Sequence, residues 1–321
     1  MTKKRRQIIT NSEVSRIIEL TLGGYPQKVL LDGKKKSNPV VIFLHGGPGS
    51  PLPFSVGCRG MFPDITESCI MVCWDQLGCG INNRPIDDHF TIRDYVEMTR
   101  DLILEIRRMF PQNELILCGM SWGSILTLRV VTEYAVPVDR CVTYGQVLCD
   151  LTFNEEVYTA LENSAMPARR KRQLAAIRQK REHDLQDGPQ VMRLIRQYTE
   201  GYQCKTGEKL PVGNFLRELL TSPDYRLRDV KALFINGYTH NQSLIQELFH
   251  VDLRENLQKV SIPYTILQGS TDIVTSTRTI QEPVSQAGNP LLTCEVIDRN
   301  GHIPDKRGMD RIIQACIRGT S

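Results

Sequence analysis

The sequence predicts an α/β protein built on a mostly parallel β-sheet with helices on both faces. Short apolar runs, typical of buried parallel strands, alternate with longer segments in which apolar residues repeat at helical spacing. The alternation runs through residues 40–145 and resumes after residue 253, and a charged, helix-rich segment without strand-like runs lies between. We therefore predict one α/β core that is interrupted by a helical insertion.

The first strands are expected near the N-terminus. Residues 17–22 and 27–31 read as an antiparallel pair separated by Gly23-Gly24-Tyr25-Pro26. The continuous apolar runs Val40–Leu44 and Ile70–Trp74 predict buried strands, and each opens onto a loop that contains glycine. Such loops permit a backbone to approach a ligand closely, although glycine and proline also favour plain loops.

The best-specified helix spans Thr91–Phe110. Thr91 and Asp94 form the pattern of a capping box, apolar residues repeat at helical spacing, and Pro111 ends the helix. A further strand is expected at Arg140–Tyr144.

The segment Gly119-Met120-Ser121-Trp122-Gly123 joins an apolar strand at Leu115–Leu117 to an apolar helical pattern. Strand, G-x-S-x-G and helix in this order form the context of a nucleophile elbow, a tight turn that exposes a serine hydroxyl at a helix N-terminus. The pentapeptide alone is common and also fits an ordinary turn of small residues. Because an apolar strand and a helix flank it here, we interpret Ser121 as a nucleophile.

After the insertion, the pattern predicts two strands and two helices. They are expected at Pro263–Leu267 (strand), Thr275–Ala287 (helix), Leu291–Ile297 (strand) and Ile303–Ile317 (helix). We therefore assign residues 1–145 and 242–321 to the core, and residues 146–241 to a helical cap inserted over the active site.

Within the cap, loops are predicted at Asp187-Gly188-Pro189 and around Gly207, at residues 206–211. The basic run Ala168–Arg181 could bind a polyanion, but charge runs more often form a solvated helix, which is the interpretation we favour.

Composition narrows the class of protein. The chain has 321 residues, of which 40% are hydrophobic and 24% charged, as in ordinary globular proteins, and its net charge of +4 does not argue for nucleic acid. No run approaches the roughly 20 apolar residues of a membrane span, and the basic N-terminus lacks the apolar region of a signal peptide. The ten cysteines lack metal-ligand spacing. We expect a cytoplasmic protein with a disordered terminus around Lys3–Arg6.

A serine nucleophile needs a base, and the base needs an acid that orients it. Open α/β sheets bind ligands at the carboxyl ends of their strands, and Asp272 and His302 follow the last two predicted strands. Among the six histidines, only His302 lies downstream of a strand that follows the elbow. Alone, Asp272 would suit a turn and His302 a surface loop. Asp298 is a rival acid, but its place four residues before His302 suits the end of a strand better.

Four motifs together resemble the proline iminopeptidase family of α/β-hydrolases. They are HGGPG at His45–Gly49, DQLGCG at Asp75–Gly80, GMSWGS at Gly119–Ser124 and GH at Gly301–His302. The match runs in the family's order across nearly the whole catalytic core, and HGGPG combined with G-x-S-W-G-S is far more specific than either motif alone. The resemblance implies an α/β-hydrolase fold.

The resemblance also implies a role for each matching residue. Ser121 would be the nucleophile, Asp272 the orienting acid and His302 the general base. The backbone N–H groups of Gly47 and Trp122 would form the oxyanion hole, a role that suits the free donors expected at these two positions.

The chain departs from the family pattern in two places. Leu77 and Asn82 occupy positions where the family usually has an arginine or similar residue and a serine. The characterised prolyl enzymes select a free amino terminus with cap glutamates, one of them in a Trp-Glu pair, but both tryptophans of this chain lie outside the cap. Other cap glutamates could serve: Glu155, Glu156, Glu162, Glu200 and Glu208. We predict that Glu200, which lies between two tyrosines, and Gly46 contact the substrate.

These observations predict a serine hydrolase that cleaves amide or ester bonds through an acyl-enzyme. An aminopeptidase that releases an N-terminal proline or small residue from short peptides is favoured. A carboxylesterase or amide hydrolase of small metabolites is the alternative enzyme, and a non-catalytic ligand-binding protein on a hydrolase scaffold is the alternative of another class. No cofactor or metal is expected, and a small molecule or short peptide is the expected partner, without nucleic acid or membrane. The sequence does not determine the oligomeric state.

Overall fold

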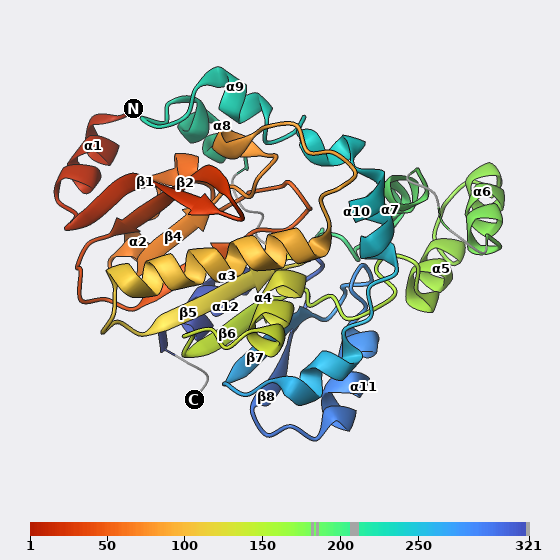
Figure 1. The fold of residues 1–321 in the computed structure, drawn as a ribbon. Coiled ribbons are helices and arrows are strands. Elements are labelled where there is room, and N and C mark those ends of the chain that lie inside the picture. Colours follow the sequence, from red (N-terminus) through yellow and green to blue (C-terminus); the bar gives the residue numbers. More distant parts are fainter. Residues whose placement is uncertain (181–182, 184–185, 206–211, 319–321) are drawn as a thin grey trace.

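An eight-stranded sheet forms the middle layer of the computed structural model, which describes residues 1–180, 183, 186–205 and 212–318 (Figure 1). The strand order is β1-β2-β4-β3-β5-β6-β7-β8. The strands are β1 (Val14–Leu22), β2 (Tyr25–Gly33), β3 (Val40–Leu44), β4 (Ile70–Trp74), β5 (Leu115–Met120), β6 (Arg140–Tyr144), β7 (Tyr264–Gly269) and β8 (Leu292–Ile297). β2 pairs antiparallel with β1 and β4, and the other pairings are parallel. The predicted α/β fold class is confirmed.

Helices cover both faces of the sheet. They are α1 (Lys3–Thr10), α2 (Pro63–Thr66), α3 (Ile92–Met109), α4 (Trp122–Glu133), α5 (Glu155–Glu162), α6 (Ala168–Arg178), α7 (Asp187–Tyr198), α8 (Val212–Leu220), α9 (Leu227–Lys231), α10 (Gln242–Phe249), α11 (Thr277–Ala287) and α12 (Lys306–Arg318). Short 3₁₀ helices are η1 (Val56–Cys58), η2 (Gly80–Asn82), η3 (Gly237–His240) and η4 (Arg254–Lys259). In Figure 1, α3 and α4 lie in front of the sheet and α12 lies behind it.

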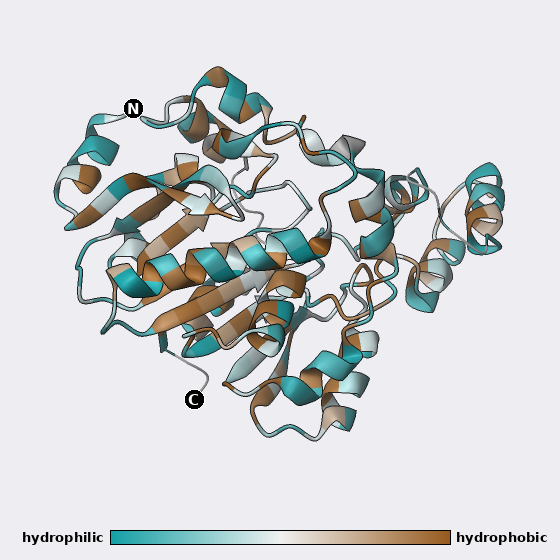
Figure 2. Ribbon diagram, in the orientation of Figure 1, coloured by the Kyte–Doolittle hydropathy of each residue, from teal (hydrophilic) through white to brown (hydrophobic). Residues whose placement is uncertain are grey.

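Alternation along each strand builds two apolar cores. In β3, Val40, Ile42 and Leu44 belong to the core under α3 and α4, whereas Val41 and Phe43 belong to the core under α12. Because both faces are buried, β3, β4 and β5 consist of apolar residues and glycine, and much of β5 is brown in Figure 2.

The helix α3 follows its sequence prediction closely. The Asp94 carboxylate accepts hydrogen bonds from both the N–H and the hydroxyl of Thr91, each at 2.7 Å. This contact satisfies a donor that the start of a helix otherwise leaves unpaired.

The N-terminus differs from its prediction. Residues Lys3–Arg6, expected to be disordered, belong to α1. The Arg5 side chain is buried, and its guanidinium donates to the carbonyl oxygens of Gly57, Arg59 and Glu218, each at 2.7 Å. The basic sequence at the N-terminus does not predict this contact, because the acceptors of the Arg5 guanidinium are backbone carbonyl oxygens.

The segment between β6 and β7 carries α5–α10, and α5–α7 project from the body at the right of Figure 1. The name cap is used below for residues 146–241. The predicted loop at Asp187–Pro189 is wrong, because these residues form the first turn of α7. Proline is tolerated there, since an N–H in the first turn has no helical acceptor. The loop predicted at residues 206–211 lies outside the described residues.

The basic run of the cap forms the helix predicted for it. α6 covers Ala168–Arg178, with Leu174 and Ile177 buried and most of its cations exposed.

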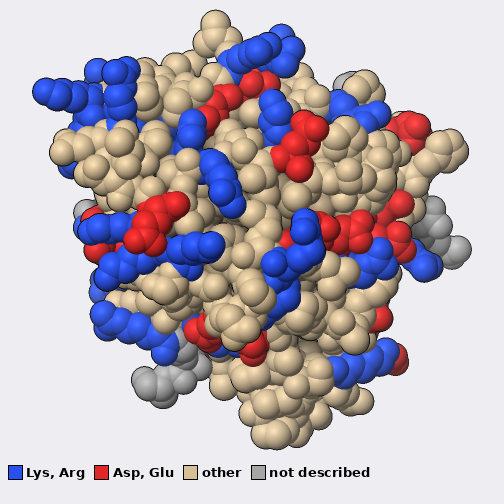
Figure 3. Space-filling model, turned by 60° about the vertical axis from the view of Figure 1, so that its left-hand side comes forward, with Lys and Arg blue, Asp and Glu red and all other residues tan. Residues whose placement is uncertain are grey.

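On the face shown in Figure 3, acidic and basic side chains are interspersed rather than gathered by sign. Within the described residues, no helix has the length and apolar character needed to cross a bilayer.

Candidate active site

The carboxyl ends of β3, β4, β5, β7 and β8 bring the predicted site segments to one edge of the sheet. Ser121 connects β5 directly to α4 and has φ 51° and ψ −119°, a backbone conformation that is strained for a serine. A Cβ on Gly123 would lie 2.1 Å from the Leu44 carbonyl oxygen, and one on Gly119 would lie 2.5 Å from the Gly123 carbonyl oxygen. Both glycines of G-x-S-x-G are therefore needed for packing, as a nucleophile elbow requires.

The structure brings Ser121, Asp272 and His302 together. The His302 Nε2 atom lies 2.8 Å from the Ser121 Oγ, and the His302 Nδ1 lies 3.0 Å from an Asp272 carboxylate oxygen. In the tautomer with the proton on Nδ1, the imidazole donates to Asp272 and accepts from the serine hydroxyl. This arrangement lets Nε2 take the serine proton.

Several donors hold the Asp272 carboxylate. One oxygen accepts from the N–H groups of Val274 (2.8 Å) and Thr275 (3.1 Å), and the other accepts from the Thr275 hydroxyl (2.8 Å) and the Gln268 amide (3.2 Å). The rival acid Asp298 has a side chain that is 73% exposed and pairs with Arg299. Asp272 is thus the acid that contacts the imidazole.

Gln268 and Thr275 were not expected to belong to the site. They lie four residues before and three residues after the predicted acid, and this proximity is the signal that could have identified them, because a buried carboxylate needs hydrogen-bond donors nearby.

Backbone groups of the cap hold His302, and Gly145, directly after β6, leaves room for its ring. Its N–H donates to the Gly201 carbonyl oxygen at 3.0 Å, and the next N–H, of Ile303, donates to the Tyr202 carbonyl oxygen at 2.7 Å. Beneath the ring, a Cβ on Gly145 would lie 3.3 Å from the imidazole Nδ1 and Cε1 atoms. Gly145 therefore leaves the space that the ring occupies.

The two predicted oxyanion-hole residues belong to the two segments that meet at Ser121, which are the start of α4 and the glycine loop after β3. Trp122 is the first residue of α4, so its N–H has no acceptor within the helix. Gly47 has φ 123° in the loop after β3, and a Cβ on its neighbour Gly46 would lie 3.3 Å from the Ser121 Cβ. The glycine loop therefore passes close to the serine, where a backbone N–H could meet an oxyanion.

Glu200 lies beside the loops that carry Asp272 and His302. Its carbonyl oxygen accepts from the Thr271 hydroxyl at 3.3 Å, and its carboxylate accepts from the Cys204 thiol at 3.5 Å. Glu156, another cap acid, accepts from the Ser276 hydroxyl at 2.6 Å. The Glu156 carboxylate is thus held by the segment that follows β7, and the Glu200 carboxylate is held by Cys204 within the cap. Glu162 instead pairs with Arg178 of α6.

The cysteines are buried or half-buried and form no disulfide among the described residues. Burial raises the pKa of the Cys58 thiol to about 12 and also raises the pKa of Cys69 and Cys141, so these thiols stay protonated and weakly reactive. The described part of the chain contains no group of three or more His, Cys, Asp or Glu side chains placed to bind a metal.

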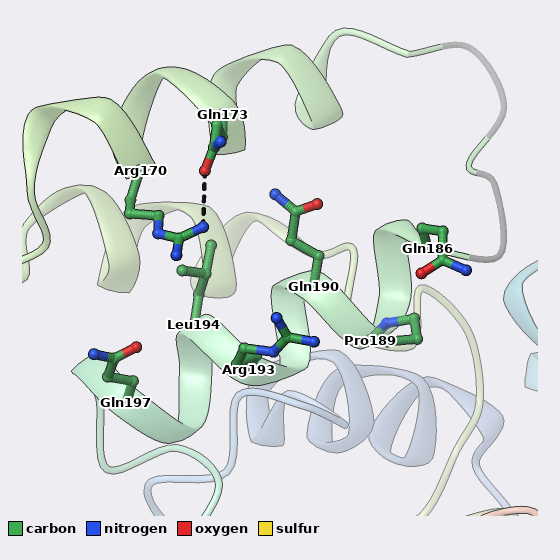
Figure 4. A pocket seen from close by; sticks show the side chains of 8 residues that line it. All are labelled: Arg170, Gln173, Gln186, Pro189, Gln190, Arg193, Leu194 and Gln197. Carbon is green, nitrogen blue, oxygen red and sulfur yellow. Dashed lines mark hydrogen bonds between the residues drawn. The ribbon is translucent and has the colours of Figure 1, made fainter.

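A separate hollow of about 200 Å³ lies in the cap between α6 and α7 (Figure 4). Its lining combines two arginines with several amides: Arg170, Gln173, Gln186, Pro189, Gln190, Arg193, Leu194 and Gln197. Arg170 donates to Gln173 at 3.1 Å along the α6 side of the hollow. None of these residues comes from a strand end, so the hollow is distinct from the site at Ser121.

The fold and these motifs define the class of protein. Residues 39–304 match the family described as alpha/beta hydrolase fold, and the chain belongs to this family. A solved carboxylesterase from Bacillus subtilis superposes with a TM-score of 0.58 at 15% identity, covering 99% of this chain and 97% of the esterase. This likeness shows the fold alone.

The sequence relatives of this chain include proteins named as peptidases. The chain is similar to the probable aminopeptidase YbaC of Bacillus subtilis (strain 168), with 24% identity over 89% of this chain and 90% of the relative. A shorter stretch is 38% identical to a proline iminopeptidase of Neisseria meningitidis, covering 34% of this chain and 33% of that enzyme. The resemblance to the proline iminopeptidase family that the motifs predict is confirmed.

Proposed function

We propose that this protein is a serine hydrolase that cleaves amide bonds through an acyl-enzyme, and that it acts as an aminopeptidase releasing an N-terminal proline or small residue from short peptides. The observation that carries the reaction class is the position of the His302 imidazole, within hydrogen-bond distance of both the Ser121 hydroxyl and the Asp272 carboxylate. The sequence relatives support the peptidase assignment.

The proposed reaction begins when Ser121 attacks the carbonyl carbon while His302 accepts the hydroxyl proton. Asp272 keeps the imidazole oriented and stabilises its protonated form. The carbonyl oxygen gains negative charge and accepts hydrogen bonds from the N–H groups of Gly47 and Trp122. His302 then gives its proton to the departing amine, and water releases the acyl group by the reverse sequence of steps.

In this proposal Glu200 recognises the free amino terminus of the substrate. Support comes from its backbone contact with Thr271, next to the orienting acid, and from its carboxylate, which accepts from the weak thiol donor of Cys204 and from no other donor among the described residues. The Glu156 carboxylate is a second cap anion, and it accepts from the Ser276 hydroxyl in the segment after β7. A positively charged amine near these acids would place the first residue's carbonyl toward Ser121.

A carboxylesterase or small-metabolite amide hydrolase is the second candidate. It is favoured by the cap, which has no tryptophan to form the Trp-Glu pair of the prolyl enzymes. The fold does not decide between the two, because a serine triad hydrolyses esters and amides by the same steps.

The test is a paired assay of the purified protein and Ser121→Ala. Substrates are proline- and alanine-naphthylamides, each with and without an N-acetyl block, and a short-chain nitrophenyl ester. We expect cleavage of the free-amine amides and a loss of roughly 10⁴- to 10⁶-fold in kcat for Ser121→Ala. Glu200→Gln should then raise KM for the free amines and leave the ester unchanged.

Other outcomes separate the hypotheses. Cleavage of the ester alone would support the esterase and overturn the aminopeptidase assignment. Cleavage that survives Ser121→Ala would overturn the serine mechanism. If a fluorophosphonate probe does not label the wild type at Ser121, the protein is a ligand-binding one on this scaffold.

A further inference from the structure

The DQLGCG motif at Asp75–Gly80 has no role in the proposed reaction, although it was one of the motifs that carried the resemblance. Gln76, the second residue of the motif, is fully buried just beyond the end of β4. A buried amide stabilises a fold only when its polar atoms are paired, and an apolar side chain would fill the same space without that requirement. The hydrogen-bond partners of Gln76 therefore indicate the role of its side chain.

Gln76 connects the two segments that would supply the oxyanion-hole donors. Its Oε1 accepts from the Trp122 indole N–H at 2.8 Å. Its backbone N–H donates to the His45 Nε2 at 3.1 Å, and its side-chain amide donates to the His45 carbonyl oxygen at 3.4 Å. The Gly47 donor lies two residues beyond His45, so one glutamine touches the chain on both sides of the oxyanion hole.

The protonation state of His45 decides which hydrogen bonds its ring makes. Burial lowers the pKa of its imidazole to about 4, so the ring is neutral at neutral pH. Because Nε2 accepts from the Gln76 N–H, the proton is on Nδ1, which lies 2.8 Å from the Gly46 carbonyl oxygen and donates to it. The hydrogen bonds thus continue from Trp122 through Gln76 and His45 to the residue before Gly47.

We infer that Gln76 is a positioning residue of the oxyanion hole, which fixes the separation of the Gly47 and Trp122 N–H groups through its contacts with His45 and the Trp122 indole. The inference rests on the proposed serine mechanism. A displacement of either donor weakens stabilisation of the oxyanion, which forms in the transition state, more than it weakens substrate binding. Loss of Gln76 should therefore lower kcat rather than raise KM.

The chain contains a matched control. Gln27 is also fully buried, and its Oε1 accepts from the Trp74 indole N–H at 2.9 Å, between β2 and β4 and away from the glycine loop. Gln76→Leu and Gln27→Leu each remove one buried acceptor from an indole N–H. If the role of Gln76 is only structural, the two variants should change activity alike.

The experiment measures kcat and KM on whichever substrate the wild type hydrolyses, together with inhibition by phenylboronic acid, whose tetrahedral adduct with serine places an oxygen in the oxyanion hole. We expect Gln76→Leu to lose roughly 10- to 100-fold in kcat, with KM within about threefold, and to bind the boronic acid correspondingly more weakly. Gln27→Leu should keep both values near those of the wild type, even where it lowers the free energy of unfolding as much.

A second pair of variants tests the same hydrogen bond if Gln76→Leu does not fold. Trp122→Phe removes the indole N–H and keeps the backbone donor, and Trp74→Phe is its control. Where Gln76→Leu does fold, the double variant Gln76→Leu/Trp122→Phe should lose no more activity than Gln76→Leu alone, because Gln76→Leu already removes the hydrogen bond that Trp122→Phe removes. Equal kcat values for the Gln76 and Gln27 variants, or a loss confined to KM, would overturn the inference. A wild type without Ser121-dependent turnover would instead overturn the proposed function.

Discussion

Asp272 is the residue on which the orientation of the catalytic imidazole depends. Asp272→Asn keeps the shape of the side chain, but its amide can donate to the His302 Nδ1. This contact favours the tautomer with the proton on Nε2, which cannot accept the Ser121 proton. We expect kcat to fall roughly 10⁴-fold with little change in KM. The measurement is steady-state kinetics on the substrate that the wild type cleaves.

The rival acid supplies the control. Asp298 is exposed and pairs with Arg299, so Asp298→Asn should leave kcat within about twofold of the wild type. A large loss for Asp298→Asn, or near-normal turnover by Asp272→Asn, would contradict the assignment of the orienting acid.

His45 makes the protein sensitive to acid. Burial lowers the pKa of His45 to about 4, whereas an unfolded histidine titrates near 6.5. Between these values the unfolded chain binds a proton that the folded protein does not, so stability falls as the pH decreases from 6.5 to 4. This group alone should lower the free energy of unfolding by about 2 kcal/mol between pH 7 and pH 5.

Urea unfolding at the two pH values tests this effect. His45→Asn should lose about 2 kcal/mol less than the wild type over that interval, whatever its stability at pH 7. His89→Asn, at an exposed position, should lose as much as the wild type. Equal losses for the wild type and His45→Asn would show that His45 is not held neutral.

At the scale of single elements, the capping contact of α3 is worth testing. Asp94→Ala leaves the Thr91 N–H without its acceptor and removes a negative charge from the helix N-terminus. The free energy of unfolding should decrease by about 1 kcal/mol. Glu105→Ala on the same helix removes only a surface pair with Arg108 and should cost less than about 0.5 kcal/mol. A larger cost for Glu105→Ala than for Asp94→Ala would contradict the capping role.

The elements that the sequence predicts best are those whose pattern is local. The bounds of β3, β4 and β6 agree with the predicted runs, and α3 begins directly after its predicted cap. The first turn of α7 was missed because Asp-Gly-Pro suits a loop and a helix start equally well, and burial of Asp187 within the cap decides between them.

In the site too, the residues that a local sequence pattern marks could be predicted, and those that depend on distant contacts could not. Ser121, Asp272 and His302 could be predicted because each follows a strand in the order of a known family. Gln76 could not be assigned a role, since its partners lie 31 and 46 residues away and only the fold brings them together.

At the scale of the whole molecule, the cap contacts both halves of the site. On one side Gly201 accepts from the backbone of His302. On the other side the Tyr225 hydroxyl donates to the Asp75 carboxylate, and the Asn236 amide donates to the Gly49 carbonyl oxygen at 2.8 Å. Movement of the cap would therefore reach both the general base and the loop that carries the oxyanion hole.

The N-terminal helix joins this arrangement through Arg5. Its guanidinium binds carbonyl oxygens of the segment after β3, at Gly57 and Arg59, and of α8 in the cap, at Glu218. A single buried side chain thus holds three parts of the chain that are distant in sequence, and its charge is compensated by carbonyl dipoles and by Glu218 at 3.6 Å.

Arg5→Ala tests whether this junction stabilises the whole fold. The change leaves three carbonyl oxygens without their charged donor, so we expect the free energy of unfolding to decrease by about 3 kcal/mol. Arg6→Ala, at the neighbouring exposed position, should cost less than about 0.5 kcal/mol.

Urea unfolding measures the free energy of unfolding of both variants. Limited proteolysis should show cleavage within the cap sooner in Arg5→Ala than in Arg6→Ala, because α8 loses its attachment to the core. Equal stability of the two variants would mean that α1 rests on the surface without joining core and cap.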